Sequence, residues 1–301
     1  MEENERKESR VVRWLKLLLK IAVTIACLWY VSGKIDFDKA GAALQKANWF
    51  YLLLAFIAFV ISKWIAAIRL NIYFRNINIH LPARQNIKLY WLGMFYNLFL
   101  PGSISGDAYK VILLTKKYKI AYKKTTSAVL LDRFSGLLGL GLILAVYALL
   151  VLKNHLYISI IVSGAIFAVA ALYFVIRYWL RDFVRDFLPT LLLGLSVQIS
   201  QVICVYCLLH SLHLPIQQAA WIFIFLAAAV ITVLPISLGG GLGTREFVFR
   251  EGALFFSLDP SIAVVISLLF YLCTLIASLP ALYFVFNNPL EEKKKDSLLS
   301  P

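Results

Sequence analysis

The chain interrupts an apolar run at Leu100-Pro101-Gly102-Ser103-Ile104-Ser105-Gly106-Asp107, and again at Leu234-Pro235-Ile236-Ser237-Leu238-Gly239-Gly240-Gly241-Leu242-Gly243-Thr244-Arg245-Glu246. Each break follows an apolar stretch that is short for a complete membrane span, and each leads into a second amphipathic stretch. Lipid does not tolerate irregular backbone, so such a segment must be buried in protein or line a wet cavity. Paired Pro- and Gly-interrupted segments in the two halves of a membrane protein indicate a transport site.

The composition is that of a polytopic membrane protein. Apolar residues make up 61% of the 301 residues and charged residues 15%, against roughly 45–50% and about 25% in ordinary globular domains. The net charge of +14 comes from Lys and Arg in short loops between apolar runs. This distribution favours membrane topology and attraction to anionic lipid over nucleic-acid binding.

Six apolar runs are long enough for full spans, which need ~20 residues. They cover residues 13–32, 49–69, 126–152, 156–177, 188–209 and 260–286. Two further runs, 88–116 and 218–257, contain the breaks. The halves of the first, about 88–100 and 107–116, have the length of half-spans, which favours re-entrant helical hairpins over two complete crossings.

The positions of Lys and Arg predict the orientation. With the N-terminus inside, 22 of the 30 basic residues fall in the inner regions 1–20, 69–88, 109–124, 177–186 and beyond 287, and four fall in the outer loops. This excess predicts that both termini lie inside. The expected fold is therefore all-α: one integral membrane domain over 1–301, with six spans and two hairpins.

The two hairpins would enter from opposite sides. Residues 13–152 and 156–286 would then form an inverted repeat, with short cytoplasmic tails over 1–12 and 287–301. Inverted repeats are common among transporters, whose substrate sites lie at the repeat interface.

Charged residues beside the breaks are the candidate substrate-binding residues: Asp107, Lys110, Asp132, Arg133, Arg245 and Glu246. Ionisable residues inside a membrane are costly and usually face a pathway and pair with one another. Arg245 and Lys110 could hold a phosphate, while Asp107 and Glu246 could counter those cations or bind a coupling ion. Purely structural ion pairing is the alternative, as is interfacial snorkelling for Asp132-Arg133.

Local chemistry refines these expectations. Ser105 or Asp107 can cap the helix that restarts after the first break. Arg69 is expected at the membrane interface and Lys63 deeper in the same span. Gly136, Gly139 and Gly141 form a small-residue stripe that favours close approach of a neighbouring helix.

The sequence contains no HExxH or other metal spacing, no Ser/His/Asp set, no P-loop and no dinucleotide fingerprint. We therefore expect no catalytic residues, no metal site and no cofactor.

Several of these residues together resemble a known family. They are Asn97-Leu98-Phe99-Leu100-Pro101-Gly102 with Gly106-Asp107 and Lys110, then Asp132-Arg133, then Leu234-Pro235 with Gly240-Gly241-Leu242-Gly243-Thr244-Arg245-Glu246. This pattern is similar to the lysylphosphatidylglycerol synthase transmembrane-region family, which includes the membrane half of the multiple peptide resistance factor. Lys110 stands where Arg is common in that family, and Asp132 where Glu is common.

The resemblance implies movement of an aminoacylated phospholipid between leaflets. It also implies that the cytoplasmic domain that adds lysine is absent here, because the chain ends soon after the last predicted span. The expected function is flipping of an anionic phospholipid or polyprenyl-phosphate-type lipid across a cell inner membrane. The alternatives are a lipid-linked glycosyl or phosphoryl transferase, or an accessory subunit of a separately encoded synthase or transferase. Expected partners are membrane lipid, such a separate enzyme, and further copies of the chain in a homo-oligomer.

Overall fold

The computed structural model describes residues 37–100, 104–214, 219–233 and 244–290. Within these ranges every regular element is a helix. They are α2 Phe37–Lys46, α3 Trp49–Arg75, α4 Ala83–Phe99, α5 Ser105–Tyr118, α6 Tyr122–Val151, α7 His155–Trp179, η1 Arg181–Asp186, α8 Phe187–Ser211, α9 Ala219–Val233, α10 Thr244–Phe255, α11 Pro260–Ser278, η3 Leu279–Ala281 and α12 Leu282–Phe286. The prediction of an all-α fold is confirmed for this part of the chain.

Five segments of the described chain are long and apolar enough to cross a membrane: Trp49–Arg75, Tyr122–Val151, His155–Trp179, Arg181–Ser211 and Pro260–Phe286. They correspond to five of the six predicted spans. The sixth, residues 13–32, lies outside the described residues. The protein is therefore a multi-pass membrane protein.

The two interrupted runs each form a pair of shorter helices. The first gives α4 and α5, of 17 and 14 residues, and the second gives α9 and α10, of 15 and 12 residues. At 1.5 Å per residue these helices are about 18 to 26 Å long, shorter than the ~30 Å hydrocarbon core. The predicted halves of the first run are too short, because α4 begins at Ala83 and α5 ends at Tyr118.

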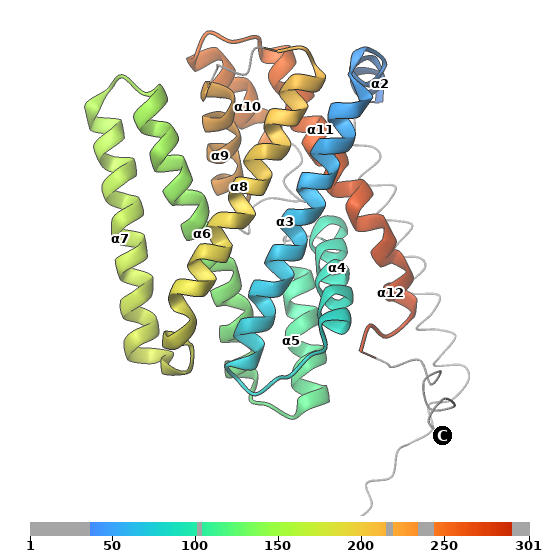
Figure 1. Ribbon diagram of the computed structural model, residues 1–301, viewed down its shortest axis with the longest axis vertical. Helices are drawn as coiled ribbons and strands as arrows, with labels where there is room; N and C mark the ends of the chain where they lie inside the picture. Colours follow the sequence, from blue (N-terminus) through green and yellow to red (C-terminus); the bar gives the residue numbers. More distant parts are fainter. Residues whose placement is uncertain (1–36, 101–103, 215–218, 234–243, 291–301) are drawn as a thin grey trace, which may run out of the picture.

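The two pairs lie at opposite ends of the bundle. Figure 1 shows α4 and α5 in its lower half and α9 and α10 in its upper half. The predicted break residues Pro101, Gly102, Pro235, Gly239, Gly240, Gly241 and Gly243 lie outside the described residues. Gly106 lies in the first turn of α5.

Three helices that start at the upper end, α3, α7 and α11, have the same kind of cap. Asn48, Asn154 and Asp259 precede α3, α7 and α11, and each side-chain oxygen accepts a hydrogen bond from a backbone N–H two residues on, at 2.7 to 3.0 Å. Such caps satisfy backbone donors that a helix start leaves unpaired.

Basic loops gather at the lower end of the bundle. The α3–α4, α5–α6 and α7–α8 connections and the end of α12 all lie there (Figure 1). Lys124 Nζ at the start of α6 contacts Asp182 Oδ2 of η1 at 3.0 Å, and Lys117 Nζ of α5 donates to the Leu290 carbonyl at 2.8 Å. Elements far apart in the sequence are thus tied together at one end.

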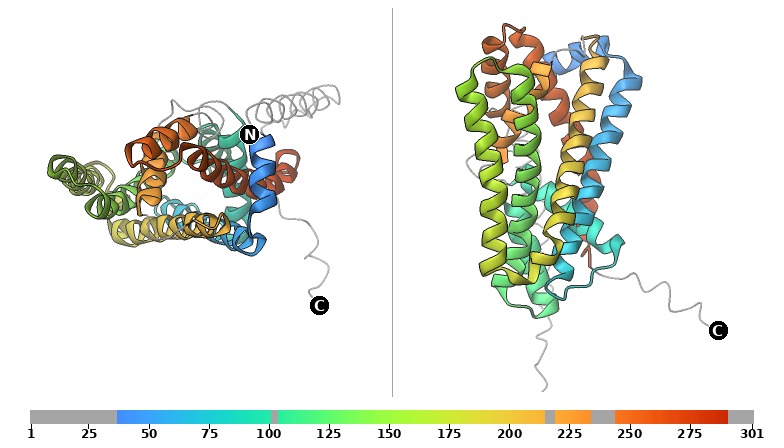
Figure 2. Two further views of the ribbon diagram at one scale, coloured as in Figure 1. Left: turned by 90° about the horizontal axis from the view of Figure 1, so that it is seen from above. Right: turned by 60° about the vertical axis from the view of Figure 1, so that its left-hand side comes forward.

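The centre of the bundle is formed by α3, α6 and α8, which α9 and α11 cover in the upper half. By contrast, α7 packs against α6 and η1, and Ile176 is its one buried residue. Figure 2 shows α7 at the edge of the molecule, beyond α6. A helix this apolar and this exposed is suited to contact with lipid.

Candidate functional site: a charged cavity inside the bundle

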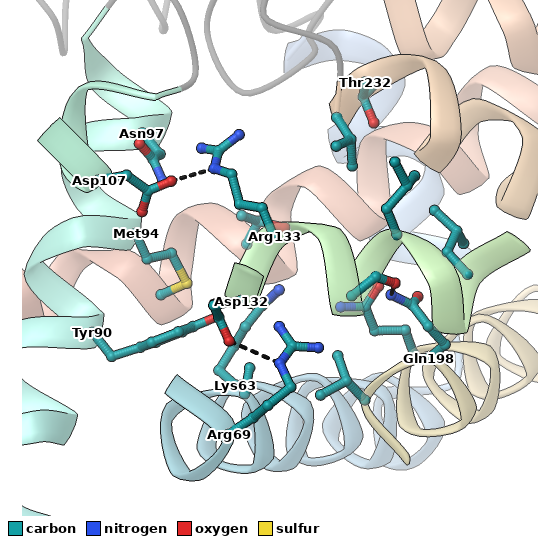
Figure 3. Close-up of a pocket in the computed structure, with 18 of the residues that line it drawn as sticks. Lys63, Arg69, Tyr90, Met94, Asn97, Asp107, Asp132, Arg133, Gln198 and Thr232 are labelled. Atoms are coloured by element: carbon teal, nitrogen blue, oxygen red, sulfur yellow. Dashed lines mark hydrogen bonds and ion pairs between the residues drawn. The ribbon is translucent and has the colours of Figure 1, made fainter. Parts of the chain in front are cut away.

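A cavity of about 300 Å³ lies where the first helix pair meets the long helices. Its walls come from α3, α4, α5, α6, α8, α9 and α11, so both interrupted segments contribute to it. The charged residues in its lining are Lys63, Arg69, Asp107, Lys110, Asp132 and Arg133, and Figure 3 shows several of their side chains around one space.

Asp107, in the first turn of α5, is held between two cations. Its Oδ1 accepts from Lys110 Nζ at 3.0 Å, and its Oδ2 contacts Arg133 Nε of α6. The Lys110 ammonium also lies 4.8 Å from the centre of the Tyr90 ring of α4. This cluster ties the first helix pair to α6.

Arg69 and Asp132 form a second ion pair, between α3 and α6. Arg69 Nε lies 2.8 Å from Asp132 Oδ1, and Arg69 is 4% exposed. Arg69, which was predicted to lie at the membrane interface, does not extend from the bundle: its guanidinium turns inward to the carboxylate of Asp132. One nitrogen of the guanidinium, Nη1, is buried and has no hydrogen-bond partner among the described residues.

Two glycines make room for the Arg69 fork. A Cβ atom added at Gly136 would lie 3.2 Å from the guanidinium, and one at Gly194 would lie 3.4 Å from Nη1. Beside this point α6 and α8 touch closely, since a Cβ at Gly139 would lie 2.7 Å from the Gly194 carbonyl carbon. The predicted close approach is confirmed at Gly136 and Gly139. It is wrong at Gly141, where the space is open.

Lys63 is a further basic residue of the cavity, and among the described residues it has no acidic partner. It lies on α3, its Nζ is 4.6 Å from the centre of the Phe59 ring, and no described carboxylate lies within ion-pair distance of it. Lys63 lines the same cavity as the Arg69–Asp132 pair, and Figure 3 labels all three side chains there. The signal in the sequence is a single lysine inside the apolar run 49–69.

The predicted cap of α5 is wrong. The Ser105 hydroxyl donates instead to the Tyr96 carbonyl at 2.7 Å, and Asp107 is held in its ion pairs. Asn97 of α4 supplies the cap, because its Oδ1 accepts from the Gly106 N–H at 2.8 Å. The contact is possible because Gly106 lies directly against the backbone of Gly93.

Arg245 and Glu246 lie at the start of α10, against α11. The Arg245 guanidinium is 5.0 Å from the centre of the Phe270 ring, and Glu246 Oε1 accepts from the Ser267 hydroxyl at 3.1 Å. Neither residue is among the described residues that line the cavity. Arg245 Nη1 is buried, and within the described part of the chain it has no hydrogen-bond partner.

The structure thus brings four of the six predicted site residues together: Asp107, Lys110, Asp132 and Arg133. Sequence reasoning did not include Lys63, Arg69 or Gln198 among the site residues. Arg69 and Lys110 were also counted with the inner regions that predict orientation, whereas both lie buried in the cavity wall.

Comparison with known proteins agrees with the sequence pattern. The model of the family described as lysylphosphatidylglycerol synthase TM region matches residues 17–188 and 179–281. The UPF0104 membrane protein PH1989 of Pyrococcus horikoshii is 24% identical over 154 residues. That alignment covers 50% of this chain and 45% of that protein, so it spans less than half of the relative's length. On the family match, which covers most of the chain, this protein belongs to the lysylphosphatidylglycerol synthase TM region family.

Proposed function

We propose that this protein moves an anionic lipid headgroup across the membrane through the charged cavity. The observation that carries the proposal is the charge of its described lining: four basic and two acidic side chains inside a bundle of helices that are apolar enough to span a membrane. Ionisable groups at membrane depth mark substrate or ion pathways far more often than they serve packing.

The cavity has the size of a headgroup site. Small-molecule pockets range over about 300–1,000 Å³, and about 300 Å³ is at the lower end of that range. The acyl chains would therefore remain in lipid while the headgroup passes through the polar interior. The walls come from both interrupted segments, as expected of a site between two repeats.

The membrane orientation is part of the proposal. The lower end of the bundle, with its basic loops, would face the cytoplasm, in keeping with the positive-inside rule. The two helix pairs would then be re-entrant hairpins that enter from opposite sides. The inverted repeat and the location in a cell inner membrane follow from the same reasoning.

The N-terminus of α5 is already occupied by groups of the protein itself. The N–H of Gly106 is taken by Asn97, and Asp107 already places a negative charge in the first turn of α5. An anionic headgroup would therefore be bound by basic side chains and not by the positive end of α5.

The test is reconstitution of the purified protein in liposomes that contain head-labelled anionic phospholipids or polyprenyl phosphates. We expect faster exposure of the label in the opposite leaflet than in empty vesicles. Arg133→Gln should slow it, because Lys110 still holds Asp107 while one cavity cation is lost. Lys153→Gln removes an exposed cation outside the cavity and should change nothing. No acceleration with either lipid class would argue against transport and favour an accessory role.

A further inference from the structure

We infer that Lys63 and Arg69 form a phosphate subsite that selects anionic headgroups and excludes cationic, aminoacylated ones. The inference rests on the proposed transport function and names its substrate class. The substrate class that it names, an anionic headgroup, differs from the aminoacylated lipid after which the family is named.

The carboxylates of the cavity are already neutralised. Asp132 is paired with Arg69, and Asp107 contacts both Lys110 and Arg133. An incoming ammonium group would need a carboxylate, but each carboxylate in the described lining is engaged by at least one cation. Placing a further positive charge beside four basic side chains would be unfavourable in an environment of low dielectric.

The described lining holds more basic side chains than carboxylates, four against two. Lys63 has no acidic partner in the described chain, and its ammonium lies over the ring of Phe59, 4.6 Å from the ring centre. An unpaired ammonium inside a membrane-spanning helix is unfavourable unless an anion joins it. A phosphate is the partner that matches this charge.

Arg69 supplies the second group of the subsite. Its Nε is used by Asp132, but Nη1 is buried and has no acceptor. Leaving a buried donor of a charged group unpaired is unfavourable. A phosphate oxygen is an acceptor that would satisfy this N–H, and Lys63 lies on the same wall, six residues earlier in α3.

Gln198 of α8 also lines the cavity and offers an uncharged hydrogen-bond acceptor. Its Nε2 donates to the Gly136 carbonyl at 3.2 Å, while its buried Oε1 has no donor. A headgroup hydroxyl can donate to this oxygen. A phosphodiester with a hydroxyl-bearing, uncharged headgroup therefore matches the groups that the cavity presents.

The experiment compares three labelled lipids in liposomes that hold the full chain: phosphatidylglycerol, phosphatidylethanolamine and lysylphosphatidylglycerol. We expect wild-type protein to move phosphatidylglycerol fastest and lysylphosphatidylglycerol slowest. Lys63→Gln should reduce phosphatidylglycerol transport roughly 10- to 100-fold, as expected for loss of one hydrogen bond to a charged group. Lys63→Arg should retain most of it, and Lys153→Gln is the matched control.

Two results would overturn the inference: equal or faster movement of lysylphosphatidylglycerol by wild-type protein, or unchanged phosphatidylglycerol transport in Lys63→Gln. The wild-type comparison needs no variant, so a folding defect in Lys63→Gln does not remove the test. If wild-type protein moves none of the three lipids and no polyprenyl phosphate either, the proposed function fails. The subsite is then tested by measuring the binding of short-chain lipids to the detergent-solubilised protein. The inference requires that phosphatidylglycerol binds more tightly than lysylphosphatidylglycerol and that Lys63→Gln weakens the binding of phosphatidylglycerol.

Discussion

The two carboxylates of the cavity, Asp107 and Asp132, are tolerated inside the bundle because each forms an ion pair with a basic side chain. Arg69 and Asp132 are 4% and 7% exposed. They lie on two different helices, α3 and α6, and are 63 positions apart in the chain. Desolvation of two charges can cost as much as their attraction returns. Such a pair contributes little net stability, yet removal of one partner leaves a bare charge in the interior.

Asp132→Ala should therefore destabilise the protein by about 3–5 kcal/mol, the range for breaking a buried ion pair. The double variant Arg69→Leu with Asp132→Leu should recover much of that loss, because no unpaired charge remains. Thermal unfolding in detergent measures both. Full stability of Asp132→Ala would show that Arg69 finds another acceptor. The double variant should still lack transport, since it removes half of the proposed phosphate subsite.

Arg245→Ala and Glu246→Ala are expected to abolish transport while leaving membrane insertion intact. The reason is their charge at the start of α10, where Arg245 stacks on Phe270 and Glu246 accepts from Ser267. Liposome transport and membrane fractionation provide the two measurements. Activity equal to wild type would assign these residues to the packing of α10 on α11 instead.

At the scale of elements, the first helix pair depends on contact between two backbones. Gly106 of α5 lies against the backbone of Gly93 of α4, and the Lys110 side chain crosses Gly93 on its way to Asp107. Small residues allow this approach, as they do in other membrane helix pairs. The hairpin geometry and the position of the Asp107 cluster are therefore linked.

Gly106→Ala should open the α4–α5 contact, because its Cβ would overlap the Gly93 carbonyl. Overpacking of this kind costs about 1–3 kcal/mol or more. Gly141→Ala on α6 is the control, since nothing lies within 4 Å of its Cβ position. Thermal unfolding should separate the two variants. An equal melting temperature for both would mean that the hairpin adjusts without strain.

At the scale of the whole molecule, the two ends of the bundle differ in charge. The basic connections and the end of α12 lie at the lower end, and α7 gives the molecule one long apolar edge. A positive end is expected to remain on the cytoplasmic side during insertion. The orientation of the cavity between the two leaflets follows from this.

Cysteine labelling in intact cells checks the orientation. Lys153→Cys, in the exposed α6–α7 connection at the upper end, should react with a membrane-impermeant thiol reagent added outside. Lys123→Cys, exposed at the lower end, should react only after the cells are opened. The opposite pattern would place the basic end outside. Each variant is compared with the parent chain, which carries four native cysteines within apolar runs.

The sequence by itself determined the class of the protein, five described spans and the division of the interrupted runs into helix pairs. These features depend on the length of apolar runs and on Pro and Gly, which are local properties of the chain. It also predicted Asp107, Lys110, Asp132 and Arg133 as site residues, because charges inside apolar runs are conspicuous.

Only the tertiary structure decided which charges meet. Arg69 looked interfacial because it lies near the end of a span, and its inward turn toward Asp132 depends on how α3 packs against α6. Likewise, Asn97 caps α5 because two glycines bring the helices of the pair together. The same packing gives Lys63 no acidic partner among the described residues, since contacts across helices are set by three-dimensional arrangement and not by spacing along the chain.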